Sequence, residues 1–110
     1  MREFAYHLGM PTPLPISVPY EQIAEFCRAN NIVRLALFGS VLRDDFTAAS
    51  DVDVLVEFEA GKTPGLAFFR MQDQLGELLG RRVDLNTPRS LSRYFRDEVL
   101  REARDIHVAA

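Results

Sequence analysis

The chain has 110 residues, a formal net charge of −3 and 47% apolar residues, a size and composition that fit one globular domain with one hydrophobic core. No apolar run is long enough to cross a membrane, and the acidic balance argues against broad binding to a nucleic-acid backbone. The single cysteine, Cys27, excludes an internal disulfide, and the two histidines are too far apart in the sequence to suggest a zinc site. Because the N-terminus lacks the basic start and apolar core of a secretory signal, we expect a cytoplasmic protein.

Residues 1–19 are rich in proline, which favours an extended or irregular arm over a helix. We interpret this arm as a poorly ordered terminus. The alternative is a strap that lies on the core, or on a neighbouring subunit, through Phe4, Tyr6, Leu14 and Ile16. The remaining residues, 20–110, are expected to form the whole domain.

Helical and strand-like periodicities alternate along this domain, which predicts an α+β fold with a mixed sheet flanked by helices. The first half is expected to contain a core-facing helix, a buried strand, a short helix and a second strand, at residues 20–30, 32–38, 41–46 and 50–58. The second half is expected to contain a long amphipathic helix, a short strand, a terminal helix and a frayed end, at residues 66–79, 82–86, 90–104 and 106–110. Arg34, inside the first strand, either reaches a phosphate pocket or, as we favour, lies at a sheet edge.

Two aspartates one residue apart open the second strand. Side chains alternate along a strand, so Asp51 and Asp53 point to one face while Val52, Val54 and Val56 fill the other. Neighbouring carboxylates repel each other and favour a hard cation such as Mg²⁺, which often also binds substrate phosphates. An unpaired charge at the head of a buried strand is costly, so the pair indicates a metal site rather than a surface turn.

A second feature of the same stretch is the Gly39-Ser40 turn that follows the first strand. Gly39 lets the backbone approach a ligand closely, Ser40 offers a hydroxyl, and a helix beginning at Val41 would direct free amides and its dipole at an anion. Together with the aspartates, this phosphate-binding turn suggests phosphoryl or nucleotidyl transfer. Arg43 is expected either to assist with nucleotide phosphates or to remain solvated and paired with Asp44 or Asp45.

The order Gly39-Ser40, ten intervening residues, then Asp51-x-Asp53 resembles the signature of the nucleotidyltransferase superfamily that includes DNA polymerase beta and the kanamycin nucleotidyltransferases. With so short a chain, the stretch GSVLRDDFTAASDVDVLVEF looks like the minimal nucleotidyltransferases, the antitoxins encoded beside HEPN-domain toxins. The resemblance implies a palm-like fold and a third acidic residue on a later strand. Asp84 matches that position, although an exposed aspartate before a turn is the alternative.

By this resemblance, Asp51, Asp53 and Asp84 are the catalytic and metal-binding residues, and the nucleotide is bound by Gly39, Ser40 and Arg43. The implied activity is Mg²⁺-dependent transfer of AMP from ATP to a hydroxyl, expected to be a tyrosine of a cognate HEPN ribonuclease toxin, with release of pyrophosphate. Two alternatives stay open: an inactive antitoxin that neutralises its toxin by binding alone, and a small-molecule nucleotidyltransferase working as a homodimer. No direct contact with nucleic acid or membrane is expected.

Overall fold

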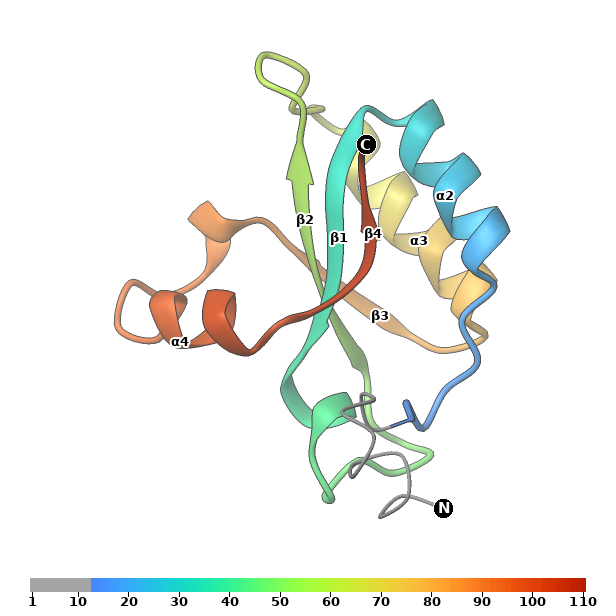
Figure 1. Cartoon of the computed structure of the whole chain (residues 1–110), viewed down its shortest axis with the longest axis vertical. Coiled ribbons are helices and arrows are strands. Elements are labelled where there is room, and N and C mark those ends of the chain that lie inside the picture. The colour runs from blue at the N-terminus through green and yellow to red at the C-terminus, as the bar shows by residue number, and fades with distance from the viewer. Residues whose placement is uncertain (1–12) are drawn as a thin grey trace.

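Four strands form one mixed sheet in the order β3-β2-β1-β4. The structure, a computed structural model, describes residues 13–110 (Figure 1). Its strands are β1 (Ile32–Phe38), β2 (Val52–Phe58), β3 (Val83–Asn86) and β4 (Arg104–Val108). The central strand β1 pairs antiparallel with β2 and β4, whereas β3 runs parallel to β2 at the sheet edge. The described part of the chain is therefore an α+β domain with a mixed sheet, as the sequence predicts.

Two helices, α2 (Tyr20–Ala29) and α3 (Ala67–Leu79), cover one face of the sheet (Figure 1). Their inward residues pack on the alternating valines of β2, because residues one helical turn apart share a face. Gly80 ends α3 in the left-handed conformation that favours glycine, with φ of 64°. Burial of Cys27 on α2 raises the pKa of its thiol to about 12, so this cysteine is a protonated core residue.

The other face of the sheet carries a smaller apolar cluster beneath α4 (Arg96–Glu102). Ala36 of β1, Leu55 of β2 and Leu91 form its buried centre. In Figure 1, α4 lies on the side of the sheet opposite α2 and α3. This second face is the one to which the odd-numbered side chains of β2 point, including Asp53.

Arg34 also points to this second face, and the prediction that it lies at a sheet edge is wrong, because β1 is an interior strand. Its guanidinium bonds Glu57 on one neighbouring strand at 3.0 Å and Asp105 on the other at 2.6 Å. These two carboxylates raise the pKa of Arg34 against the opposing effect of burial. The charge is thus compensated across three strands, which is how a sheet interior accepts an arginine.

The described end of the N-terminal arm lies against the core. Leu14, Ile16 and Val18 are partly buried and pack on the main apolar cluster. For these residues the alternative prediction, a strap that lies on the core, is correct, and the prediction of a poorly ordered terminus is wrong. Phe4 and Tyr6 lie outside the described residues, and the division of the chain at residue 19 stays a prediction.

The C-terminal prediction needs correction. Instead of one helix over residues 90–104, the chain forms a 3₁₀ turn, η2 (Pro88–Ser90), and the seven-residue α4. The expected frayed end is β4, which pairs with β1. Thr87 and Ser90 cap each other's backbone in η2, and the extended Leu91 ends this turn before α4 begins. Strand β4 is held by its pairing with β1 and by Ile106, which is buried in the main core. Among residues 13–110, no helix has the length and apolar character needed to span a bilayer.

Candidate active site

Asp53 and Asp84 are direct neighbours on parallel strands. Their Cα atoms are register partners between β2 and β3, as Val52 and Val83 are one position earlier. The two valines point into the main core, so alternation turns both aspartates to the opposite face. Asp53 is half-buried and Asp84 is exposed on the edge strand. The predicted juxtaposition of the two carboxylates is confirmed.

The environment of Asp53 disfavours a negative charge. Burial raises the pKa of its carboxyl, and the nearby carboxylates of Asp84 and Asp51 raise it further, while Arg43 lowers it. A carboxyl group that is both desolvated and repelled by like charges is stabilised by any cation placed beside it. Perturbed carboxylates of this kind are concentrated at functional sites.

Gly39 approaches Asp53 so closely that any other residue would be strained and would displace the Asp53 carboxylate. A Cβ atom on Gly39 would overlap Oδ2 of Asp53, and the glycine has a φ of 76°. Both observations follow from the end of β1, where Phe38 is the register partner of Asp53 and the next residue must turn away from the sheet. The glycine turn therefore brings its backbone to the edge of the acidic cluster.

The short helix expected after this turn does not form. Gly39–Leu42 is a four-residue 3₁₀ turn, η1, which ends when the Arg43 amide donates to the Ser40 carbonyl at 2.9 Å. So short a turn supplies little aligned dipole. Any affinity of this segment for an anion must therefore come from individual amides and the Ser40 hydroxyl, and the predicted contribution of a helix dipole is wrong.

Arg43 is exposed beside this turn. Its guanidinium pairs with Asp45 at 3.4 Å, with both side chains mostly in solvent, so the pairing expected of a solvated arginine is present. Exposed pairs of this kind are weak. Arg43 nevertheless lies near enough to Asp53 to lower its pKa and lines a cleft next to Gly39, which leaves its guanidinium available to a phosphate.

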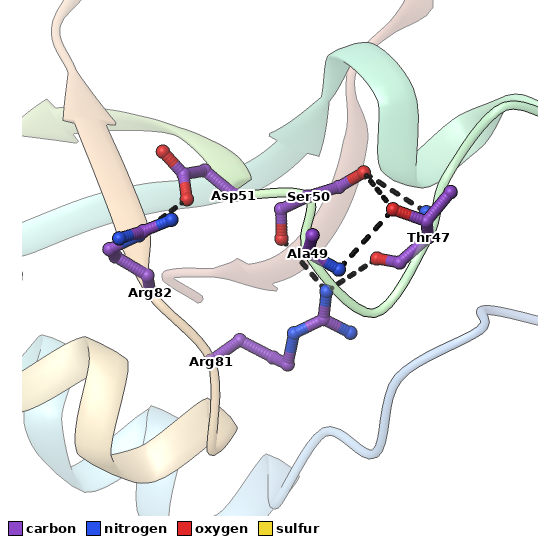
Figure 2. Close-up of polar contacts among 6 residues, drawn as sticks. All are labelled: Thr47, Ala49, Ser50, Asp51, Arg81 and Arg82. Atoms are coloured by element: carbon purple, nitrogen blue, oxygen red, sulfur yellow. Dashed lines mark hydrogen bonds and ion pairs between the residues drawn. The ribbon is translucent and has the colours of Figure 1, made fainter.

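Asp51 stands one residue ahead of β2, where Arg82 holds its carboxylate. The distance from Arg82 Nε to Asp51 Oδ1 is 2.7 Å (Figure 2). The two residues immediately precede the register partners Val52 and Val83, and the Val52 amide donates to the Arg82 carbonyl at 2.9 Å. The parallel pairing of β2 with β3 thus brings this ion pair next to the Asp53 and Asp84 carboxylates.

Sequence reasoning missed the roles of the two arginines before β3. Besides the Arg82 ion pair, the Arg81 guanidinium donates to the carbonyls of Thr47 and Ser50, each at 2.8 Å (Figure 2). It also lies over the Phe46 ring, 4.5 Å from the ring centroid. Arg81 therefore fixes the loop that leads into Asp51. The adjacent arginines ahead of a short strand were the available signal, but only the tertiary structure shows their partners.

No three aspartate, glutamate, histidine or cysteine side chains within residues 13–110 converge into a ready-made metal cluster. Asp51, the third predicted carboxylate, is paired with Arg82. The chemistry of the donors still fits Mg²⁺, because Asp53 and Asp84 are neighbouring carboxylates and the pKa of Asp53 is raised despite the opposing charge of Arg43. Asp51 joins them as a third donor if its side chain leaves Arg82.

Comparison with known proteins identifies the class. A family model described as a nucleotidyltransferase domain matches residues 20–106. A "putative protein adenylyltransferase" of Methanocaldococcus jannaschii is 38% identical over 77 residues, which cover 70% of this chain and 82% of that protein. A second protein of that name from the same organism is 50% identical over 52 residues, but only 51% of its length is covered. The protein adenylyltransferase MntA of Thermococcus cleftensis is 42% identical over 69 residues, 62% of this chain and 68% of that protein.

Solved structures agree with this result. One described as a "putative minimal nucleotidyltransferase" superposes with a TM-score of 0.63 at 42% identity, over 76% of this chain and 85% of that one. A toxin-antitoxin crystal structure with AMP-PNP has a TM-score of 0.66 at 23% identity, over 84% and 75% of the two chains, and supports the fold alone. The chain therefore belongs to the nucleotidyltransferase domain family and is an enzyme of that class. Within the family it is a minimal nucleotidyltransferase.

Proposed function

We propose that this nucleotidyltransferase transfers AMP from ATP to a tyrosine hydroxyl of a cognate HEPN-type toxin and thereby neutralises the toxin. The observation that carries the proposal is the position of Asp53, which is half-buried between Asp84 on the next strand and the glycine turn at Gly39. A carboxylate under such repulsion beside a backbone turn suits a site that binds a cation and a phosphate chain together. Because the reaction consumes ATP, we place the protein in the cytoplasm.

Each predicted site residue has a role in this scheme. Asp51 and Asp53 would hold Mg²⁺, with Asp84 as a further oxygen donor, and Mg²⁺ when bound neutralises the charge of the triphosphate. The Gly39 amide and the Ser40 hydroxyl bind the β and γ phosphates. Arg43 exchanges its weak surface pairing with Asp45 for a phosphate oxygen.

In the transfer step, the acceptor hydroxyl attacks the α-phosphorus of ATP in line with the leaving group. A new P–O bond forms to the acceptor, the bond to the β-phosphate oxygen breaks, and pyrophosphate leaves. Asp84 accepts or orients the proton of the attacking hydroxyl. Asp84 suits this task because it is exposed on the edge strand β3, where an acceptor can approach from solvent.

The size of the cleft favours a macromolecular acceptor over a small molecule. The cleft beside Gly39, which Phe38, Arg43 and Phe95 also line, measures ≈ 180 Å³, which leaves no room to enclose a small acceptor beside the nucleotide phosphates, since pockets that enclose such ligands measure roughly 300–1,000 Å³. Next to this cleft, Tyr94 is 85% and Phe95 49% exposed. A partner protein that covers such aromatic side chains can complete the site.

The relatives support a toxin as that partner. Relatives at 38% and 42% identity carry the name protein adenylyltransferase. Fold neighbours at 21–23% identity include toxin-antitoxin complexes of MntA, and one is described as a tri-AMPylated Shewanella oneidensis HEPN toxin in complex with MNT antitoxin. A HEPN-type partner is therefore the first candidate acceptor.

Intact-mass spectrometry of a co-expressed HEPN-type partner tests the proposal. The partner is incubated with this protein, Mg²⁺ and each of the four nucleoside triphosphates in turn. We expect a mass gain of one or more AMP units with ATP, located on a tyrosine by peptide mapping. Asp53→Asn abolishes the gain, whereas the matched control Asp73→Asn, an exposed aspartate on α3, retains it.

Two results would refute protein adenylylation. A partner that co-purifies and loses its ribonuclease activity without any mass change indicates an antitoxin that acts by binding alone. Transfer to a drug-like or sugar acceptor in the absence of a partner protein indicates a small-molecule enzyme. Full transfer by Asp53→Asn contradicts the assigned site in either case.

A further inference from the structure

We propose that Arg82 is a positioning residue that holds Asp51 away from Asp53 and Asp84 until a divalent cation displaces it. The inference rests on the proposed function, because it takes these aspartates as cation ligands. It adds that Arg82 competes with the cation for Asp51: the Arg82 guanidinium is bound to this one of the three carboxylates (Figure 2).

The register of the sheet explains why Arg82 meets Asp51 and not the other two aspartates. Asp53 on β2 faces Asp84 on β3. Asp51 lies two residues before Asp53, and Arg82 lies two residues before Asp84. Side chains two residues apart share a face of a strand. The four side chains therefore form two neighbouring pairs, one of opposite charge and one of like charge.

The two pairs differ in net charge, because one joins an arginine to an aspartate and the other joins two aspartates. Burial and the carboxylates of Asp84 and Asp51 raise the pKa of Asp53, and the cation that opposes them is Arg43 rather than Arg82. Arg82 thus compensates Asp51 while the Asp53 and Asp84 pair keeps the negative potential that attracts a cation. A cation that enters at this pair draws Asp51 toward itself, and the ion pair with Arg82 opens.

The ion pair is weak enough to open in this way. The Arg82 and Asp51 side chains are 80% and 47% exposed, and exposed pairs contribute little free energy. Once released, the guanidinium remains at the rim of the site, where a phosphate group of the substrate is a suitable bidentate partner. Arg82 is therefore expected to weaken binding of a cation in the absence of nucleotide, without preventing the cation and the nucleotide from binding together.

Titration of the protein with Mn²⁺ in the absence of nucleotide tests this inference, with free Mn²⁺ measured by electron paramagnetic resonance. We expect Arg82→Ala to bind Mn²⁺ about two- to fivefold more tightly than the unmodified protein, the range that corresponds to loss of one exposed ion pair. Arg82→Lys keeps the charge and is expected to stay near the unmodified value. The control Arg28→Ala removes one exposed positive charge from the end of α2, on the opposite face of the sheet, and is expected to leave Mn²⁺ affinity unchanged.

The outcomes separate this inference from the proposed function. Arg82→Ala with an affinity equal to or weaker than that of Arg28→Ala overturns the positioning role of Arg82. Asp53→Asn serves as the site control: Mn²⁺ binding that persists in this variant contradicts the metal site of the proposed function, whatever Arg82→Ala does. Loss of Mn²⁺ binding in Asp53→Asn together with tighter binding in Arg82→Ala supports both.

Discussion

The Asp53 carboxylate occupies the space that a side chain at Gly39 would need: a Cβ atom at residue 39 would overlap Oδ2 of Asp53. The relationship links the end of β1 to the beginning of β2. It makes Gly39 part of the acidic cluster, because any side chain there must push the carboxylate aside.

Gly39→Ala is therefore expected to lower both stability and activity. Its positive φ alone costs alanine about 1–2 kcal/mol, and displacement of Asp53 is expected to reduce nucleotidyl transfer at least tenfold. Gly61→Ala is the matched control, since Gly61 has a φ of 78° with nothing within 4 Å of the added Cβ. Urea unfolding should show a similar loss for both variants, while a transfer assay should show a defect in Gly39→Ala only. Equal activities would refute the role of the contact.

Asp53→Asn is expected to stabilise the protein at neutral pH. The folded state raises the pKa of Asp53 above its unfolded value, so its contribution to stability is complete at low pH and declines as pH rises through the folded pKa. Asparagine has no charge to lose and escapes this decline. Urea midpoints in the absence of divalent cations should be higher for Asp53→Asn at pH 7, with the difference shrinking toward pH 3. A lower midpoint at pH 7 would contradict the repulsion inferred here.

Arg34→Met is expected to lower stability by about 1–2 kcal/mol, because Glu57 and Asp105 then face each other across the sheet without a cation. Arg82→Ala, which removes a far more exposed ion pair, is expected to change stability by less than about 0.5 kcal/mol. Thermal or urea unfolding of the two variants makes the comparison. The triple variant Arg34→Met/Glu57→Gln/Asp105→Asn should recover part of the loss, and a failure to recover would argue against uncompensated charge as its cause.

Arg81→Ala is expected to free the loop ahead of Asp51. The substitution removes two hydrogen bonds, to the carbonyls of Thr47 and Ser50, and the contact with the Phe46 ring. Amide hydrogen exchange over residues 47–50 should become faster by at least tenfold, as for a loss of about 1.4 kcal/mol. Arg82→Ala, which leaves these bonds in place, should not change it. Exchange that is equally slow in both variants would show that Arg81 does not hold the loop.

The sequence by itself determined the parts of this protein that depend on local pattern. The alternation Val52, Asp53, Val54 predicts one buried and one polar face, and glycine after an apolar strand predicts the turn at Gly39. The spacing of apolar residues predicts helices α2 and α3, and Gly80 after the last turn of α3 predicts where that helix ends. Such features can be predicted from the sequence because they depend on residues that are close together in the chain.

The tertiary structure decided what depends on pairing between distant residues. Strand β4 has one buried apolar residue, Ile106, too weak a pattern to predict, and forms because the free edge of β1 accepts it. The interior position of Arg34, the partners of Arg81 and the ion pair between Asp51 and Arg82 likewise follow from strand order and register. The spacing of Asp53 and Asp84 along the chain leaves their distance open, and only the parallel pairing of β2 with β3 makes them neighbours.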